Sequence, residues 1–404
     1  MRSVSSVVSR PLFAVIAAQI GLHSCMTGLR MAAPLAALAM GHSALEVGLV
    51  LSLFAVAPVA LALRAGRFAD RHGFHRPLRI AVTLAMLAAA VAVAASLIDE
   101  ARITLLCVAA ALSGAGTNLG AIAFQRTAGR MAADPIERRR VFSWLGLAPA
   151  VANAVGPVLA GVTIDLLGFP AAFALLMLLP LASLWWARRV PVEVRDPVPE
   201  RQARSAWELL ASPALRRLLF VNWLLASAWD VHTLLVPILG HDRGFSASAI
   251  GLVLGAFAAA VAAVRIVIPA LAHRLRESTV LVVAMLWAGV VLGVYPFVQS
   301  AWLMALLAAL LGLSLGAVQP MIMSTLVQIT PAHRHGEAIA LRSMVMHMSS
   351  ALMPMAFGAA GAAIGASGLF WLAGAAVGAG SMPARGIGRG PGSSGSVFGD
   401  SRAE

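Results

Sequence analysis

The chain has 404 residues, of which 60% are hydrophobic and 12% charged, and its mean hydropathy is +0.87. This composition excludes an ordinary soluble domain and indicates a multi-pass membrane protein. The net charge of +13 does not predict nucleic-acid binding, because every basic residue in it is an arginine and most of these fall in alternate predicted loops. Cys25 and Cys107 both lie inside apolar segments, so neither a disulfide nor a metal site is expected.

Twelve apolar segments of membrane-spanning length follow one another along the chain. Arginines concentrate at alternate ends of these segments, and the positive-inside rule then places both termini in the cytoplasm. We therefore expect a multi-pass protein of the plasma (inner) membrane. The predicted spans are 12–39, 46–64, 78–97, 103–125, 140–164, 169–187, 217–240, 249–270, 279–299, 301–326, 337–358 and 366–382.

A short, arginine-rich stretch separates the second and third spans, and its pattern is Gly-x-x-x-Asp-Arg-x-Gly-x-x-Arg over residues 66–76. It resembles the loop between helices 2 and 3 of major facilitator superfamily transporters. The resemblance implies an all-α membrane protein with twelve transmembrane helices in two six-helix, pseudo-symmetric bundles. It also implies a latch between the cytoplasmic ends of the bundles, although the arginines by themselves could simply fix the topology. The latch residues are Gly66, Arg67, Asp70, Arg71, Gly73 and Arg76.

The fifth span carries the pattern Gly156-Pro157-x-x-x-Gly161, preceded by Ala152. This pattern resembles one in helix 5 of the superfamily that is associated with exporters exchanging substrate for protons, although Ala152 replaces the first glycine. Small residues four apart also allow ordinary close helix packing, and proline bends a helix. The resemblance favours export, and packing is the alternative explanation.

An internal repeat divides the chain, since residues 41–55 recur as residues 244–258 at an offset of 203. Parallel repeats of this kind are typical of two bundles joined by a linker. A short surface helix is expected near Trp207 in that linker. The predicted organisation is an N-terminal six-helix bundle over 1–187, a cytoplasmic linker over 188–215, a C-terminal six-helix bundle over 216–382 and a disordered cytoplasmic tail over 383–404.

Polar residues on the first and seventh spans predict a cavity. Gln19, His23 and Arg30 follow one face of the first span, and Asn222 and Asp230 follow the equivalent face of the seventh. The 203-residue offset places the two charges about one turn apart if the halves face each other. Ionisable residues inside a membrane are costly and mark functional sites.

We therefore predict that Arg30 and Asp230 pair across the cavity, and that competition between substrate and Asp230 for Arg30 couples proton uptake to transport. The alternative is that Arg30 extends to the membrane surface and Asp230 faces water. Arg265 lies near the inner surface and is expected to extend into it. Further candidates that could line the cavity are Asn118, Gln319 and Arg342.

Nothing in the sequence predicts catalysis, a metal, a cofactor or a nucleotide site, so we expect a monomeric transporter and not an enzyme. Its expected partners are a small-molecule substrate, the lipid bilayer and a proton as coupling ion. The first hypothesis is secondary active, proton-linked efflux of a small organic solute by alternating access. The second is proton-coupled uptake of a small organic anion, because the guanidinium fork of a cavity arginine suits carboxylates. The third is a non-transporting membrane sensor. The sequence contains no recognisable signalling domain, which argues against it.

Overall fold

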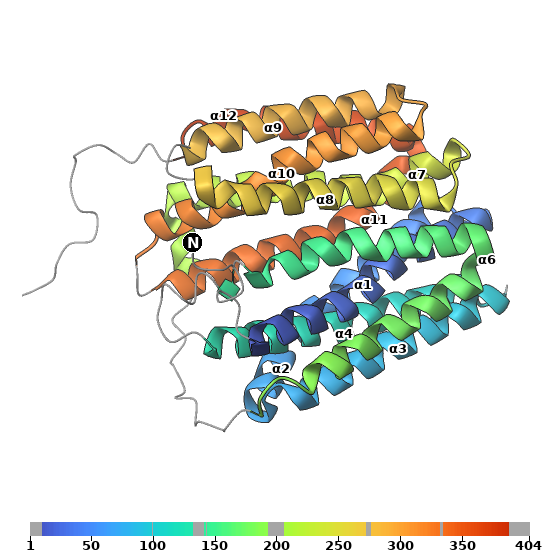
Figure 1. The fold of residues 1–404 in the computed structure, drawn as a ribbon. Coiled ribbons are helices and arrows are strands. Elements are labelled where there is room, and N and C mark those ends of the chain that lie inside the picture. Colours follow the sequence, from blue (N-terminus) through green and yellow to red (C-terminus); the bar gives the residue numbers. More distant parts are fainter. Residues whose placement is uncertain are drawn as a thin grey trace, which may run out of the picture.

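The computed structural model describes residues 10–98, 100–131, 141–142, 144–192, 206–271, 276–331 and 334–387. These residues form a bundle of long helices (Figure 1). Ten helices in the described part of the chain are long and apolar enough to cross a membrane. The start of α1 and the short α12 lie at the same end of the bundle (Figure 1), as an even number of crossings requires.

The described part of the first half contains five long helices. The longest of them, α6, has 41 residues and doubles back at Gly168, whose φ of 82° is a conformation that glycine adopts without steric cost. It therefore contains most of the fifth predicted span, from Leu147 onward, and all of the sixth. The helices are α1 (Arg10–Ala39), α2 (Ala44–His72), α3 (His75–Leu97), α4 (Arg102–Arg130) and α6 (Leu147–Ala187).

The second half repeats this arrangement. Its longest helix, α11, doubles back at Gly365, where φ is 67°, and contains the eleventh predicted span and most of the twelfth. The short helix η2 (Ala206–Ala211) precedes α7 and includes Trp207, as the sequence predicts. The remaining elements are α7 (Pro213–Asp242), α8 (Ala247–Leu271), α9 (Glu277–Val294), η4 (Tyr295–Phe297), α10 (Ala301–Ile329), α11 (His335–Ala379) and α12 (Ser381–Ala384).

Two predicted boundaries differ from the structure. The arginine-rich stretch over residues 66–76 is mostly helical, because α2 continues to His72 and only Gly73 and Phe74 separate it from α3. Charge marks where the chain leaves the membrane, and a helix can continue beyond that point. At the other end of the chain, Ala384 and Ile387 are buried, so the packed bundle extends past the predicted start of the tail at residue 383.

The two halves contact each other mainly where α2 packs along α11 and where α6 packs along α8. The repeated glycines explain this packing. A Cβ atom at Gly48 of α2 would collide with the Pro354 carbonyl oxygen of α11, and one at Gly251 of α8 would collide with the Pro157 carbonyl oxygen of α6. Helix backbones that approach this closely need glycine at the contact. The repeat in the sequence is therefore a repeat of the contact between the halves.

Candidate functional site

A cavity of about 260 Å³ lies between the halves, with walls from α1, α6, α7, α8, α10 and α11. It combines several polar side chains with an apolar lining, as small-molecule sites do. A smaller cavity of about 50 Å³ shares Arg30, Asn153 and Trp229 with it. The larger cavity is lined by Arg30, Pro149, Asn153, Asn222, Leu225, Ala226, Trp229, Asp230, Arg265, Leu315, Val318, Gln319, Met346 and Ser350.

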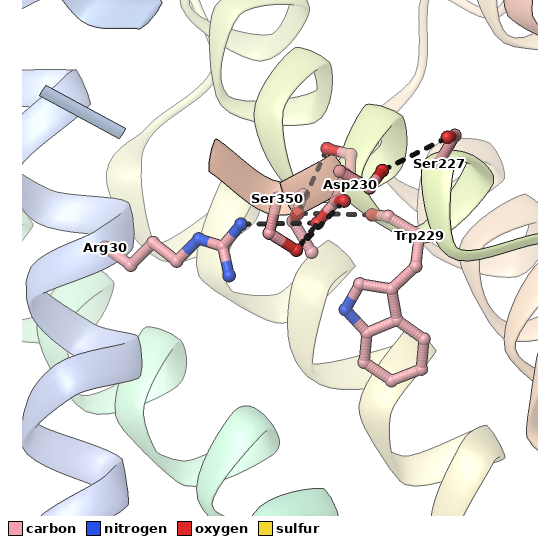
Figure 2. A network of polar contacts seen from close by, with 7 residues as sticks. Arg30, Ser227, Trp229, Asp230 and Ser350 are labelled. Carbon is pink, nitrogen blue, oxygen red and sulfur yellow. Dashed lines mark hydrogen bonds and ion pairs between the residues drawn. The ribbon is translucent and has the colours of Figure 1, made fainter. Parts of the chain in front are cut away.

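An ion pair crosses this cavity between the halves. Arg30 Nη2 of α1 lies 3.5 Å from Asp230 Oδ1 of α7, the juxtaposition that the internal repeat predicts. The Ser350 hydroxyl of α11 donates to both carboxylate oxygens of Asp230, at 3.2 and 3.1 Å (Figure 2). The Asp230 side chain is 5% exposed and that of Arg30 26%. Arg30 Nε is buried and has no hydrogen-bond partner among the described residues. The contact with Asp230 uses Nη2, so the terminal nitrogens of this guanidinium retain further donors for a ligand.

Threonines occupy the positions that the repeat makes equivalent to the two charges. Thr27, equivalent to Asp230, donates to the Ala152 carbonyl oxygen of α6 at 2.8 Å. Thr233, equivalent to Arg30, donates to carbonyl oxygens of its own helix at 3.1 Å. Each half thus carries one threonine that is satisfied locally and one charge that faces the other half.

Arg342 of α11 forms a polar cluster beside the cavity with two other predicted residues. Its Nε donates to Asn222 Oδ1 at 3.2 Å, and its Nη2 donates to Gln319 Oε1. The side chain of Arg342 is buried, so the two amides replace part of its hydration. The structure therefore brings together three candidates from α7, α10 and α11.

The structure corrects the interpretation of Arg265 as a residue that extends to the membrane surface. Arg265 lines the cavity, and its Nη1 donates to the Gly146 carbonyl oxygen of the other half at 3.2 Å. The sequence does show that Arg265 lies inside a span, which marks it as a candidate. The direction in which its side chain points depends on how α8 packs along α6, which the sequence does not show. Sequence reasoning also missed Asn153 and Trp229, which line both cavities. Neither follows a polar stripe.

Three predicted residues lie elsewhere. Gln19 of α1 is buried, and its Oε1 has no hydrogen-bond partner among the described residues. His23 of α1 is partly buried, as is Asn118 of α4, whose Nδ2 is likewise without a partner in the described part of the chain. None of the three lines the 260 Å³ cavity. Their contact with substrate stays a prediction.

The two family-like motifs have different outcomes. The side chain of Asp70 lies outside the described residues, so the latch stays a prediction; Arg67, Arg71 and Arg76 are exposed, and Gly73 forms the turn with a φ of 68°. In the helix-5 pattern, Gly156 packs against α1 and Gly161 against the start of α8. Close packing therefore accounts for these glycines, and their link with export also stays a prediction.

Among the residues that the structure describes, no group of three or more His, Cys, Asp or Glu side chains could hold a metal ion. The chemistry available in the cavity is thus that of arginine, aspartate, amides and hydroxyls. These groups can bind an anion by charge-assisted hydrogen bonds and exchange a proton at a carboxylate.

Comparisons with solved structures agree with the fold. Two solved structures have the same fold: a POT family transporter in complex with a thioalcohol conjugated peptide, with a TM-score of 0.75, and one in complex with 5-aminolevulinic acid, with a TM-score of 0.74. Each is 10% identical to this chain; the matches cover 93% and 94% of this chain and 97% and 98% of the solved chains. A search of curated proteins finds no significant match.

A family model described as Major Facilitator Superfamily matches residues 15–236 and 218–389. The match includes both bundles and therefore nearly all of the described helices. The chain belongs to the major facilitator superfamily and is a secondary active transporter.

Proposed function

We propose that the protein takes up a small organic anion together with a proton. The observation that carries this proposal is the Arg30–Asp230 ion pair, which joins the two halves inside the cavity. A guanidinium that retains free donors suits a carboxylate, which can accept two parallel hydrogen bonds from it. The substrate then binds where Asp230 now lies.

The same pair supplies a way to couple the two fluxes. When a substrate carboxylate binds Arg30 in place of Asp230, Asp230 loses its cationic partner while it stays buried. An unpaired buried carboxylate is strongly destabilising, and taking up a proton relieves that cost. Ser350, which now donates to Asp230, can instead accept a hydrogen bond from the protonated acid. Substrate and proton therefore bind together and leave together.

The membrane potential gives a reason to link proton coupling with uptake when the substrate is an anion. Moving one elementary charge across 100 mV involves about 2.3 kcal/mol, so a negative cell interior opposes the entry of an anion and favours its exit. A cell needs proton coupling to import an anion and does not need it to export one. A carboxylate in the transport cavity is therefore more useful to an importer of anions.

Proton-linked export is the second candidate, and the helix-5 pattern around Gly156 and Pro157 favours it. Trp229 at the cavity wall adds a surface that could hold an organic cation, because an indole face attracts cations. Export of a lipophilic cation would use Asp230 as the ligand for substrate and Arg30 as the residue that releases it.

One measurement distinguishes the two candidates. The purified protein is placed in proteoliposomes with a pH-sensitive dye inside, and small carboxylates or lipophilic cations are added outside. Uptake with a carboxylate carries protons into the lumen, whereas exchange for a cation drives protons out. Proton movement with cations alone would overturn the proposal and establish the second candidate.

Two substitutions test the pair itself. Asp230→Asn keeps the side-chain volume but cannot exchange a proton, so carboxylate exchange between the two sides should persist while accumulation driven by a pH gradient disappears. Arg30→Ala should weaken carboxylate binding by about tenfold or more, because a hydrogen bond to a charged group contributes about 1.5–3 kcal/mol.

The matched control is Arg189→Ala. Arg189 stacks on Trp185 and Trp186 at 4.1 and 4.3 Å, away from the cavity lining. Its substitution should leave binding unchanged. Normal pH-driven accumulation in Asp230→Asn would remove this residue from the coupling mechanism.

A further inference from the structure

We infer that the substrate is a small dianion with two separated acidic groups, such as a short dicarboxylate, held by Arg30 from the first half and by Arg265 from the second. This inference rests on the proposed anion transport and makes its substrate class specific. Both arginines line the 260 Å³ cavity. They come from α1 and α8, so a ligand that contacts both joins the two halves of the transporter.

The charges around the cavity favour a dianion. Arg30 and Arg265 line it, and Arg342 binds Asn222 and Gln319, which also line it. Against these three arginines, the lining contributes a single carboxylate, that of Asp230. Among the described residues that line the cavity or contact its lining, this leaves two positive charges without a carboxylate partner. Unpaired charge inside a membrane protein is costly. A ligand with two negative charges offsets more of this excess than a monoanion does, both with Asp230 ionised and after it has taken up a proton.

Arg265 is better suited than Arg342 to hold the second acidic group. The two amides that bind Arg342 already occupy donors on two of its nitrogens, Nε and Nη2. The described residues give Arg265 one acceptor, the Gly146 carbonyl oxygen at 3.2 Å. Guanidinium has five N–H donors, so most of those on Arg265 remain for a ligand.

The wall of the cavity suits a short hydrocarbon spacer. Apolar side chains from four helices line it together with the arginines, and they include Pro149, Leu225, Leu315 and Val318. A volume of about 260 Å³ is below the usual range of about 300–1,000 Å³ for drug-sized ligands. A chain of a few methylene groups with an acid at each end fits these surroundings better than a bulky solute.

The test measures binding to the full-length purified protein by ligand-induced thermal stabilisation. The probes are malonate, succinate, glutarate and adipate, each paired with the monocarboxylate of equal carbon number. Glycerol phosphate is added as a dianion whose two charges share one group. The unaltered chain should bind at least one dicarboxylate about tenfold or more tightly than its monocarboxylate partner, since one further charge-assisted contact is worth about that factor.

The variants assign this preference to a residue. Arg265→Gln should remove it, so that each dicarboxylate binds about as weakly as its monocarboxylate partner. Arg265→Lys should restore part of it because the charge returns. Arg189→Gln is the matched control and should keep the full preference.

The outcomes separate this inference from the proposal beneath it. Three outcomes would each overturn the inference and leave anion transport standing. The unaltered chain could bind mono- and dicarboxylates equally, Arg265→Gln could keep the preference, or glycerol phosphate could bind more tightly than every dicarboxylate. Stabilisation by none of these anions would overturn both.

Discussion

The interface between α2 and α11 and the interface between α6 and α8 are related by the internal repeat. Ser43 at the start of α2 and Ser246 at the start of α8 each accept a hydrogen bond from the backbone N–H three residues later, but the acidic residue that completes the cap comes from a different place. Both interfaces use a proline followed four residues later by glycine. Pro157 and Gly161 of α6 pack against α8, and Pro354 and Gly358 of α11 pack against α2. The backbone contact is therefore the same in both.

The helix N-termini show the difference. At α8, the carboxylate of Asp165 reaches across from α6 and accepts hydrogen bonds from the backbone N–H groups of Ala247 at 2.9 Å and Ser248 at 2.8 Å. At α2, Ser43 and Glu46 cap the helix from within the same half, with Ser43 N–H donating to Glu46 at 2.7 Å. Of these two described caps, only the one at α8 includes charge-assisted hydrogen bonds between the halves. Opening the α6–α8 interface must break them.

Removing the shared backbone contact should have the largest effect. In Gly161→Leu, the new side chain would collide with the Ala247 carbonyl oxygen, so α6 and α8 cannot pack closely. Substrate uptake in proteoliposomes should fall by about fivefold to a hundredfold, as expected when overpacking costs about 1–3 kcal/mol at a moving interface. Gly48→Leu should behave alike at the other interface.

The control for both is Gly293→Leu in α9, because no described atom outside the helix's own backbone and chain neighbours lies within 4 Å of a Cβ atom there. It should retain uptake. Equal uptake in Gly161→Leu and Gly293→Leu would mean that the close approach of α6 and α8 is not needed for transport.

Removing the bond between the halves should have a smaller, one-sided effect. In Asp165→Asn, the side chain keeps one acceptor oxygen and loses its charge, which makes the cap of α8 weaker by about 1 kcal/mol. The population in which the α6–α8 end is open should rise about fivefold. Spin labels at the exposed residues Leu167 and His241 would report this as a larger fraction of long distances. An unchanged distance distribution would show that Asp165 does not hold this end closed.

The positions of the spans, and the Arg30–Asp230 juxtaposition, follow from the sequence for physical reasons. Hydrocarbon excludes charge and unsatisfied backbone, so long apolar segments must be membrane helices. A sequence repeat implies a spatial symmetry, and symmetry relates α1 to α7. These two facts together predict that Arg30 lies opposite Asp230.

Other features depend on packing that leaves no local pattern. Arg265 faces the cavity only because α8 lies along α6, and its neighbours in sequence are apolar on every side of the helix. Asp165 caps α8 only because the end of one half lies beside the start of a helix in the other. Periodicity describes one helix at a time. It therefore does not predict contacts between distant helices, except where the internal repeat relates them.

The smallest expected effect comes from the cap that stays within one half. In Glu46→Gln, the Ser43 hydroxyl still accepts from the Glu46 backbone N–H at 3.3 Å, and glutamine can accept from the Ser43 N–H as glutamate does. The loss is a favourable charge at a helix N-terminus, and its contribution is small because solvent screens an exposed carboxylate. The unfolding temperature should fall slightly, while uptake and the spin-label distances across α6 and α8 stay unchanged. If Glu46→Gln instead opened the bundle as much as Asp165→Asn, the caps at the two interfaces would be equivalent in the opening motion. The bond from Asp165 to the other half would then have no special role.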